Sequence, residues 1–364
     1  MQFRDLHRQY QAMKAEIDDA LLKTASSGVF VLGDVVAELE QQLADYVGVK
    51  HCVTCASGTD ALRMALMVLN VGPGDAVFVP DFTFFATAEA VAMVGATSIF
   101  VDVFNEDFNI DVDDLSEKIR YVEEHTELNP RAVVAVDLFG QPADYIDLEP
   151  LCRKHNMLII EDGAQGFGGA IGGTKACSFG DISTTSFFPA KPLGCYGDGG
   201  ALFTDNDDWA ALLRSLRVHG KGADKYDNVR IGLNSRLDTI QASVLQVKLK
   251  HFGEELKAVN DIAHIYNDLL RGKVTTPVVP SAVTSSYAQY TIQSDNRDAI
   301  QARLKKADIP SMIYYSRTVS QQTAFAHLGQ QPCPVAKQLT HTVLSLPMHP
   351  YLTEQEIELI AKTI

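Results

Sequence analysis

The sequence predicts an α/β fold, in which a mainly parallel sheet flanked by helices is followed by a smaller α+β C-terminal domain. Over about residues 15–245, short and almost wholly apolar segments alternate with amphipathic segments of helical spacing. This pattern is typical of a parallel sheet that is covered on both faces. After Thr275–Pro280 it gives way to an alternating strand and separate helices. We therefore predict a large domain over residues 1–245 and a small domain over residues 246–364.

The expected helices share apolar residues at intervals of three and four positions. Near the N-terminus, Leu6, Tyr10, Met13, Ile17 and Leu21 fall on one helical face, and the other face is charged. We expect helices over residues 6–24, 36–47, 57–70, 83–95, 144–156, 236–270, 297–307 and 354–363. The expected strands are short and apolar, except that the last one alternates. They cover residues 76–80, 98–103, 132–138, 157–161, 182–187, 200–204 and 287–294.

The composition is that of a globular, acidic protein. The 364 residues include 31 basic and 46 acidic side chains, which gives a formal net charge of −15. Such a balance argues against a non-specific nucleic-acid binder, which needs clustered Lys and Arg. It leaves room for a local basic pocket that holds one phosphorylated ligand.

Targeting and membrane signals are not expected in this chain. The N-terminal segment is charged and lacks an apolar stretch of the kind that signal peptides carry. The most apolar region, Ala76–Phe104, is interrupted by acidic residues and a proline, so no membrane span is expected. Six scattered cysteines without an export signal indicate reduced thiols in a cytoplasmic protein.

Asp162 is the first candidate for chemistry. It ends the apolar segment at residues 157–161 and is followed by Gly163, Ala164 and Gln165. Ligands of open α/β sheets bind beyond the carboxyl ends of the strands, so a carboxylate there can hold a positive charge on a ligand. A helix cap or a surface turn is the alternative, and Asp162 alone does not separate the two.

The second candidate is Ser57–Asp60, which precedes a helical run. Small residues at the start of a helix expose backbone N–H groups, which suits a phosphate. Ordinary capping by Ser57 is the commoner use of such a residue.

The third candidate, Lys191, lies among prolines, aromatic residues and glycines between Ser186 and Gly200. Desolvation lowers the pKa of a lysine and leaves the amine nucleophilic, as Schiff-base chemistry requires. A lysine in a surface turn is the alternative. Cys52 and Cys55 have the spacing of a redox or zinc motif, but no second half-site is visible. We therefore expect buried thiols there and no metal site.

Together these residues match one ligand, pyridoxal 5'-phosphate (PLP). PLP needs an amine for its covalent bond, an acid for its ring nitrogen, a phosphate cup and a side chain stacked on its ring. Lys191, Asp162 and Ser57–Thr59 supply the first three, and an aromatic residue at 82–85 supplies the fourth.

The chain carries, in order, the motifs ASGTDAL, FTFFATAEA, EDGAQ, TSFFPAKPLGCYGDGGA and GLNSRLDTIQA. As an ordered set they resemble the motifs of the DegT/StrS-type nucleotide-sugar aminotransferases, and the similarity covers nearly the whole chain. The resemblance implies an aspartate aminotransferase-like (fold type I) large domain, PLP as cofactor, and a homodimer with shared active sites.

The resemblance also implies a role for each matching residue. Lys191 bonds covalently to PLP and, once released, acts as the general base, while Asp162 pairs with the ring nitrogen. The other implied cofactor contacts are Gln165 at the phenolic oxygen, Phe84 on the ring, Gly58, Thr59 and Ser186 at the phosphate, and Asn234 at the phosphate of the other protomer.

In detail the motifs are most similar to enzymes that aminate C3 of UDP-2-acetamido-2-deoxy-3-oxo-glucuronate for lipopolysaccharide O-antigen. L-glutamate is the usual donor in that group, and 2-oxoglutarate is its product. The nearest alternative is a dTDP-linked 3-oxo or 4-oxo-6-deoxyhexose. Relatives that dehydrate their substrate replace the lysine, so the presence of Lys191 favours transamination. A non-catalytic binding or regulatory protein would have lost parts of the cofactor set.

One departure from the family pattern concerns the substrate. The relatives carry His-Tyr-Pro where this chain reads Tyr314-Tyr315-Ser316, so Tyr314 replaces the His and Ser316 the Pro. Arg317 follows, either as an anion binder or as a solvated surface residue. The candidate substrate contacts are Arg236, Tyr314, Tyr315, Arg317 and His349.

Overall fold

The computed structural model describes residues 1–224, 226–329 and 332–364. Its central element is a seven-stranded sheet with the order β1-β9-β8-β5-β4-β2-β3. Only β9 runs against the others, since it pairs antiparallel with both β1 and β8. The mainly parallel sheet predicted from the sequence is therefore confirmed. Its strands are β1 (His51–Cys55), β2 (Asp75–Pro80), β3 (Thr97–Val101), β4 (Asn129–Val136), β5 (Leu158–Asp162), β8 (Ile182–Ser186) and β9 (Gly200–Thr204).

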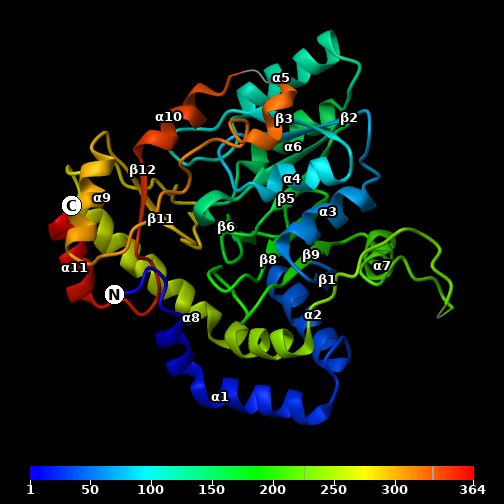
Figure 1. Ribbon diagram of the computed structural model, residues 1–364, viewed down its shortest axis with the longest axis horizontal. Coiled ribbons are helices and arrows are strands. Elements are labelled where there is room, and N and C mark those ends of the chain that lie inside the picture. The colour runs from blue at the N-terminus through cyan, green and yellow to red at the C-terminus, as the bar shows by residue number, and fades with distance from the viewer. Residues whose placement is uncertain (225, 330–331) are drawn as a thin grey trace.

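Helices cover both faces of this sheet (Figure 1). In β2, Val77 and Val79 pack into the core that contains α3 and α4, whereas Ala76 and Phe78 pack into the core that contains α5 and α6. Both faces of β2 are thus buried, which explains why its sequence is apolar throughout. The helices are α1 (Leu6–Ser27), α2 (Asp34–Val47), α3 (Gly58–Val68), α4 (Ala86–Met93), α5 (Val112–His125), α6 (Tyr145–Lys154), α7 (Asp207–Leu216), α8 (Thr239–Leu270), α9 (Arg297–Lys306), α10 (Pro334–Thr342) and α11 (Glu354–Thr363), with 3-10 turns η1 (Leu138–Gly140) and η2 (Thr323–Leu328).

Two small sheets complete the strand inventory of the described residues. β6 (Ala170–Ile171), β7 (Thr174–Lys175) and β10 (Val283–Thr284) form one of them. β11 (Tyr290–Gln293) and β12 (Val343–Leu346) pair antiparallel in the C-terminal part, as an α+β lobe requires.

The long helix α8 joins the two parts of the chain. Its first half packs on the core beside α2, and its second half packs with α9, α11 and the β11–β12 pair in a separate core. The predicted boundary at residue 245 falls inside α8. Residues from 319 to 343, although C-terminal, contribute Val319, Phe325 and Ala336 to the core of the large sheet. The division into domains at 245 stays a prediction.

Figure 1 shows α1 alongside α8, with both chain termini at the same side of the molecule, near α11. Among the described residues, none of the helices has the length and apolar character needed to cross a membrane. All six cysteines are buried.

Candidate active site

The candidate residues meet at the carboxyl edge of the central sheet. Asp162 is the last residue of β5 and lies opposite Thr184 of β8, and Ser186 ends β8 two residues later. Parallel strands end at a common edge, which is where ligands of such sheets bind. The structure therefore brings together residues that are far apart in the sequence.

Asp162 is a buried carboxylate with few donors. Only 6% of the residue is exposed. It accepts a hydrogen bond from the Thr87 hydroxyl at 3.1 Å and one from the Ala164 amide at 3.2 Å. Burial raises the pKa of Asp162, while the nearby Lys191 cation and these two donors act in the opposite direction. A carboxylate in this setting gains from a cationic partner, as a protonated ring nitrogen would be.

Lys191 lies in a tight turn between β8 and β9. Its amide donates to the Phe188 carbonyl at 2.8 Å. Gly194 closes the turn, because a Cβ there would lie 2.5 Å from the Pro189 carbonyl oxygen. Burial lowers the pKa of Lys191; the Asp162 charge raises it and the Arg4 charge lowers it further. The turn thus holds an amine that reaches the neutral, nucleophilic form at a lower pH than an exposed lysine does.

Gln165 links the large sheet to the C-terminal part of the chain. Its side-chain oxygen accepts from the Phe139 amide at 2.9 Å, and its amide nitrogen lies 3.4 Å from the Tyr315 hydroxyl. The Phe84 ring is 56% exposed, with its centroid 6.4 Å from that of Tyr315. Phe84 therefore presents an open aromatic face beside Tyr315, as the predicted stacking on the PLP ring requires.

The start of α3 forms a tight cradle with the end of β8. Ser57 caps the helix by accepting from the Asp60 amide at 3.1 Å. A Cβ on Gly58 would lie 2.7 Å from the Cβ of Ser186, and one on Gly200 would lie 2.5 Å from the Ser57 carbonyl oxygen. Glycine is thus needed for the close approach. The capping interpretation of this motif is confirmed. The phosphate interpretation stays a prediction that is compatible with it, because the capped helix presents its N-terminus to Ser186.

Asn234 and Arg236 flank a residue that contacts the same cradle. Ser235 is fully buried, and its hydroxyl accepts from the Ala56 amide at 3.1 Å. Asn234 is exposed and Arg236 is half-buried. Residues 234–236 therefore lie beside the start of α3 of their own chain, and the contact of Asn234 with a second protomer stays a prediction.

The substituted segment at Tyr314–Arg317 is fixed to the edge of the sheet by Asp81. This carboxylate, which follows β2, accepts from the Ser320 amide at 2.6 Å and from the Ser320 hydroxyl at 2.7 Å. Tyr315 and the half-buried Tyr314 are thereby held near Phe84, whereas Arg317 is exposed. Their contact with substrate stays a prediction.

His349 lies apart from this group. It is 2% exposed, and the charges that act on it are those of Arg4, Asp5, Arg8 and Glu356. Burial lowers its pKa to about 4, so it is neutral at physiological pH. No described residue forms a hydrogen bond to either ring nitrogen. The structure does not join His349 to Asp162 and Lys191, and its predicted substrate contact rests on the sequence alone.

Three residues of the site were not predicted from the sequence. Thr87 donates to Asp162, Asp81 anchors the loop after Tyr315, and Arg4 donates to the Lys191 carbonyl at 3.0 Å. Asp81 carried a signal, since it directly follows an apolar strand in the way that Asp162 does. Thr87 and Arg4 carried none, because their partners lie more than 70 residues away.

The arrangement fits PLP. The cradle at Gly58 and Ser186 would hold the phosphate, the Asp162 carboxylate the ring nitrogen, and the Lys191 amine the aldehyde carbon. Within the described ranges, no group of three or more His, Cys, Asp or Glu side chains has the arrangement of a metal site.

Comparison with known proteins agrees with this assignment. The model of the DegT/DnrJ/EryC1/StrS aminotransferase family matches residues 11–364. The chain is 41% identical over 365 residues to the UDP-2-acetamido-2-deoxy-3-oxo-D-glucuronate aminotransferase of Pseudomonas aeruginosa, covering 100% of this chain and 99% of that protein. It is also 41% identical over 365 residues to the UDP-N-acetyl-3-dehydro-alpha-D-glucosamine 3-aminotransferase of Acidithiobacillus ferrooxidans, covering 99% and 96%.

Solved structures extend the comparison to the fold and the cofactor. A DegT/DnrJ/EryC1/StrS aminotransferase from Brucella abortus superposes with a TM-score of 0.98 at 46% identity, covering 100% of this chain and 98% of that chain. Spr1654 from Streptococcus pneumoniae, solved in its PLP form, gives a TM-score of 0.89 at 26% identity over 96% and 95% of the two chains. The fold type I architecture is confirmed. The chain belongs to the DegT/DnrJ/EryC1/StrS aminotransferase family and is a PLP-dependent aminotransferase.

Proposed function

We propose that this enzyme transfers the amino group of L-glutamate to C3 of UDP-2-acetamido-2-deoxy-3-oxo-glucuronate. The observation that carries the transaminase part is the placement of Lys191 where it acts electrostatically on the buried Asp162, at the sheet edge that also carries the α3 cradle. The full-length similarity to two enzymes named for 3-oxo UDP-sugars supports the acceptor. The product is an amino sugar of the kind used in surface polysaccharide such as lipopolysaccharide O-antigen. The six scattered, buried cysteines fit a cytoplasmic site of action, where thiols are kept reduced.

Bound PLP supplies a ring that accepts electrons from the carbon next to the amino group. The Asp162 carboxylate holds a proton on the ring nitrogen, and burial strengthens this interaction because little water competes for it. Lys191 Nζ takes the proton from the Cα of L-glutamate in the first half-reaction. In the second it delivers a proton to C3 of the sugar. Its lowered pKa suits this work, since a base must be neutral before it accepts a proton.

The acceptor proposal depends on the group at C6 of the sugar. A uronate carries a carboxylate there, whereas the corresponding glucosamine carries a hydroxyl. Arg317 and Arg236 are the cations closest in sequence to the site, and neither forms a salt bridge within the described part of the chain. Arg317 follows Tyr315 by two residues and is exposed, so it is free to meet a carboxylate on the substrate. We therefore propose that Arg317 binds the C6 carboxylate of the substrate.

We also propose that the enzyme works as a homodimer. Two segments expose apolar side chains, namely Val29, Phe30, Val31, Val229 and Ile231, which are 44–88% exposed. The second segment ends three residues before Asn234, which the family pattern assigns to the phosphate of the partner. Burial of this apolar surface in a dimer would remove it from water and would carry Asn234 to the partner's cradle. Light scattering during size-exclusion chromatography measures the mass directly, and a monomer at working concentration contradicts this part of the proposal.

The acceptor is tested by single-turnover spectroscopy. L-glutamate is added to the yellow PLP form until the colour bleaches, excess donor is removed, and candidate acceptors are supplied one at a time. We expect UDP-2-acetamido-2-deoxy-3-oxo-glucuronate to restore the colour at least tenfold faster than the 3-oxo glucosamine analogue. Equal rates of colour recovery with these two acceptors would show that the enzyme does not recognise the C6 carboxylate. Recovery only with a dTDP-linked 3-oxo or 4-oxo-6-deoxyhexose would overturn the acceptor while leaving the transaminase chemistry in place.

A further inference from the structure

The N-terminal segment that precedes α1 lies against the active-site turn. Arg4 Nη2 donates to the main-chain carbonyl of Lys191 at 3.0 Å and approaches that of Pro192 at 3.5 Å. The Phe3 ring contacts the Tyr314 ring edge-on, with a centroid distance of 6.2 Å. One short segment therefore touches both the catalytic lysine's turn and the substituted substrate loop.

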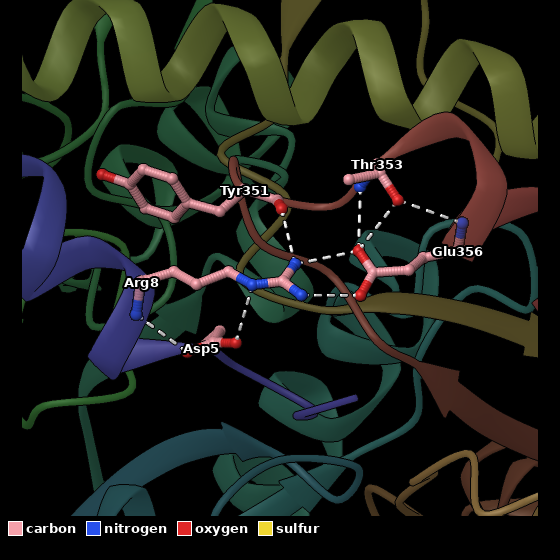
Figure 2. A network of polar contacts seen from close by, with 5 residues as sticks. All are labelled: Asp5, Arg8, Tyr351, Thr353 and Glu356. Carbon is pink, nitrogen blue, oxygen red and sulfur yellow. Dashed lines mark hydrogen bonds and ion pairs between the residues drawn. The ribbon is translucent and has the colours of Figure 1, made fainter.

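This segment is anchored to the C-terminal helix. Figure 2 shows the Arg8 guanidinium donating to both carboxylate oxygens of Glu356, at 2.9 and 2.8 Å, and to the Tyr351 carbonyl at 2.9 Å. Asp5 lies 3.3 Å from the same guanidinium. A bidentate pair of this kind fixes geometry as well as charge. The position of Arg4 is thus set by contacts that do not involve the active site.

Arg4 is a cation without an ion-pair partner. Across residues 1–224, 226–329 and 332–364, no carboxylate lies within 4.0 Å of its guanidinium. The acid that acts on it, Glu255, accepts hydrogen bonds from Gln9 and from the Tyr351 hydroxyl instead. Burial lowers the pKa of Arg4 to about 10. Placing an unpaired cation in such a site is costly, so its retention calls for a compensating role.

A second cation binds the same turn but differs from Arg4 in its effect. Lys248 is 2% exposed and donates to the Gly194 carbonyl at 2.6 Å, with its amine 4.6 Å from the centre of the Tyr196 ring. Of these two cations, only Arg4 acts electrostatically on Lys191. Of the two, Arg4 is therefore the cation whose charge opposes that of Asp162 at the reacting amine.

We propose that Arg4 is a positioning residue for Lys191: its guanidinium holds the carbonyl of the turn, and its positive charge favours the neutral amine. The proposal rests on the aminotransferase function proposed above, which gives that amine its work as a base. A neutral amine is ready to take the donor proton as soon as it is released, whereas an ammonium must first lose its own. The lowering of the Lys191 pKa by Arg4 agrees with this direction.

A purely structural role of Arg4, as a hydrogen-bond donor to the turn, and an electrostatic role predict different results. Arg4→Gln removes the charge but keeps an N–H donor for the carbonyls, whereas Arg4→Lys keeps the charge and loses the forked geometry. If charge matters, only the Gln variant shifts the protonation midpoint of Lys191. If Arg4 is only a tie, neither variant shifts it.

The experiment measures the reactivity of Lys191 as a function of pH without turnover. The full-length chain is filled with pyridoxamine 5'-phosphate, the amine form of the cofactor, so that Lys191 carries no covalent bond. Acetic anhydride at trace level labels free amines, and mass spectrometry quantifies the label on Lys191 and on the exposed Lys221 as an internal reference. No donor and no sugar are present, so failure of this proposal is distinguishable from failure of the proposed function.

We expect Arg4→Gln to raise the labelling midpoint of Lys191 by about one pH unit, the order expected for loss of one neighbouring charge. The Lys221 curve and the midpoint in Arg4→Lys should stay unchanged. Lys248→Gln, which removes the cation that holds the same turn without acting on Lys191, is the matched control and should not shift the midpoint. An unchanged midpoint in Arg4→Gln overturns the proposal, as does an equal shift in Lys248→Gln. If Arg4→Gln does not fold, Arg4→Met is measured against the same criteria.

Discussion

Two buried carboxyl groups lie directly behind the site and make the stability of the protein dependent on pH. Asp137 and Glu161 are both fully buried, and the charge of Glu161 acts on Asp137. Glu161 accepts from the Phe179 amide and the Ser183 hydroxyl, each at 2.7 Å. Asp137 accepts from the Tyr145 hydroxyl at 2.8 Å. Burial raises the pKa of Glu161 to about 7, but its donors make it the first of the two to lose a proton, so Asp137 keeps its proton to higher pH.

The size of the effect follows from one bound proton. Burial and the Glu161 charge raise the pKa of Asp137 well above its ordinary value. The native state therefore keeps a proton that the unfolded chain releases above about pH 4. Stability from this group is full at low pH and is lost as the pH rises toward the native pKa. A difference of one proton changes the free energy of unfolding by about 1.4 kcal/mol per pH unit, so Asp137 contributes up to about 2.7 kcal/mol between about pH 6 and about pH 8. Glu161, whose pKa burial raises to about 7, adds its own pH dependence in the same range.

Asp137→Asn removes this proton and keeps the shape. The amide oxygen can accept from Tyr145 and the amide nitrogen can donate to Glu161. Urea unfolding of both proteins at the two pH values measures the loss of stability. We expect the loss of stability between the two pH values to be smaller in Asp137→Asn than in the unchanged protein, by up to about 2.7 kcal/mol. Asp113→Asn, an exposed carboxylate on α5, is the control and should leave the pH dependence unaltered. Parallel losses in Asp137→Asn and the unchanged protein would refute the shared-proton reasoning.

Three further predictions concern the site and its anchor. Thr87→Val removes a donor to the Asp162 carboxylate and should slow the L-glutamate half-reaction about tenfold in stopped-flow absorption, because a hydrogen bond to a charged group is worth about 1.5–3 kcal/mol; an unchanged rate contradicts this. Arg317→Gln should raise the KM for the uronate acceptor about tenfold and leave the KM for the glucosamine analogue unchanged. Equal effects on the two KM values would show that Arg317 does not bind the C6 carboxylate. Arg8→Gln should lower the free energy of unfolding by about 1 kcal/mol at neutral pH, because it removes the ion pair with Glu356. The Arg8 hydrogen bond lowers the pKa of Glu356 to about 2, so this difference should vanish in urea unfolding as the pH falls from about 5 toward 2.

The alternating strands and helices of the large sheet could be predicted because each element carries its own periodicity. The central residues of β2 and β9 and the first three residues of β5 are apolar, because these strands are buried on both faces, and the sequence displays this directly. α5 was not predicted, although Leu115, Ile119 and Val122 have helical spacing, because its polar face is dominated by charged residues. β1 was also not predicted, because it is a short strand between two helices and its cysteines, Cys52 and Cys55, were considered as a redox or zinc motif.

Features that depend on contacts between distant segments could not be predicted. The packing of Val319 and Phe325 on the core of the large sheet leaves no local pattern, because it is fixed by Asp81, more than 230 residues earlier. The same is true of Arg4, whose partner Lys191 is 187 residues away. The cofactor residues, by contrast, each follow a strand or begin a helix, and their places in the sheet follow from the order of these elements.

The central claim is that Lys191 is the residue that binds PLP and releases it to the donor. Borohydride reduction of the yellow protein, followed by digestion and mass spectrometry, fixes the cofactor to the lysine that carries it. We expect the added mass on Lys191, and its loss when L-glutamate is supplied before the reductant. Label on another lysine, or label that L-glutamate does not diminish, would contradict the account.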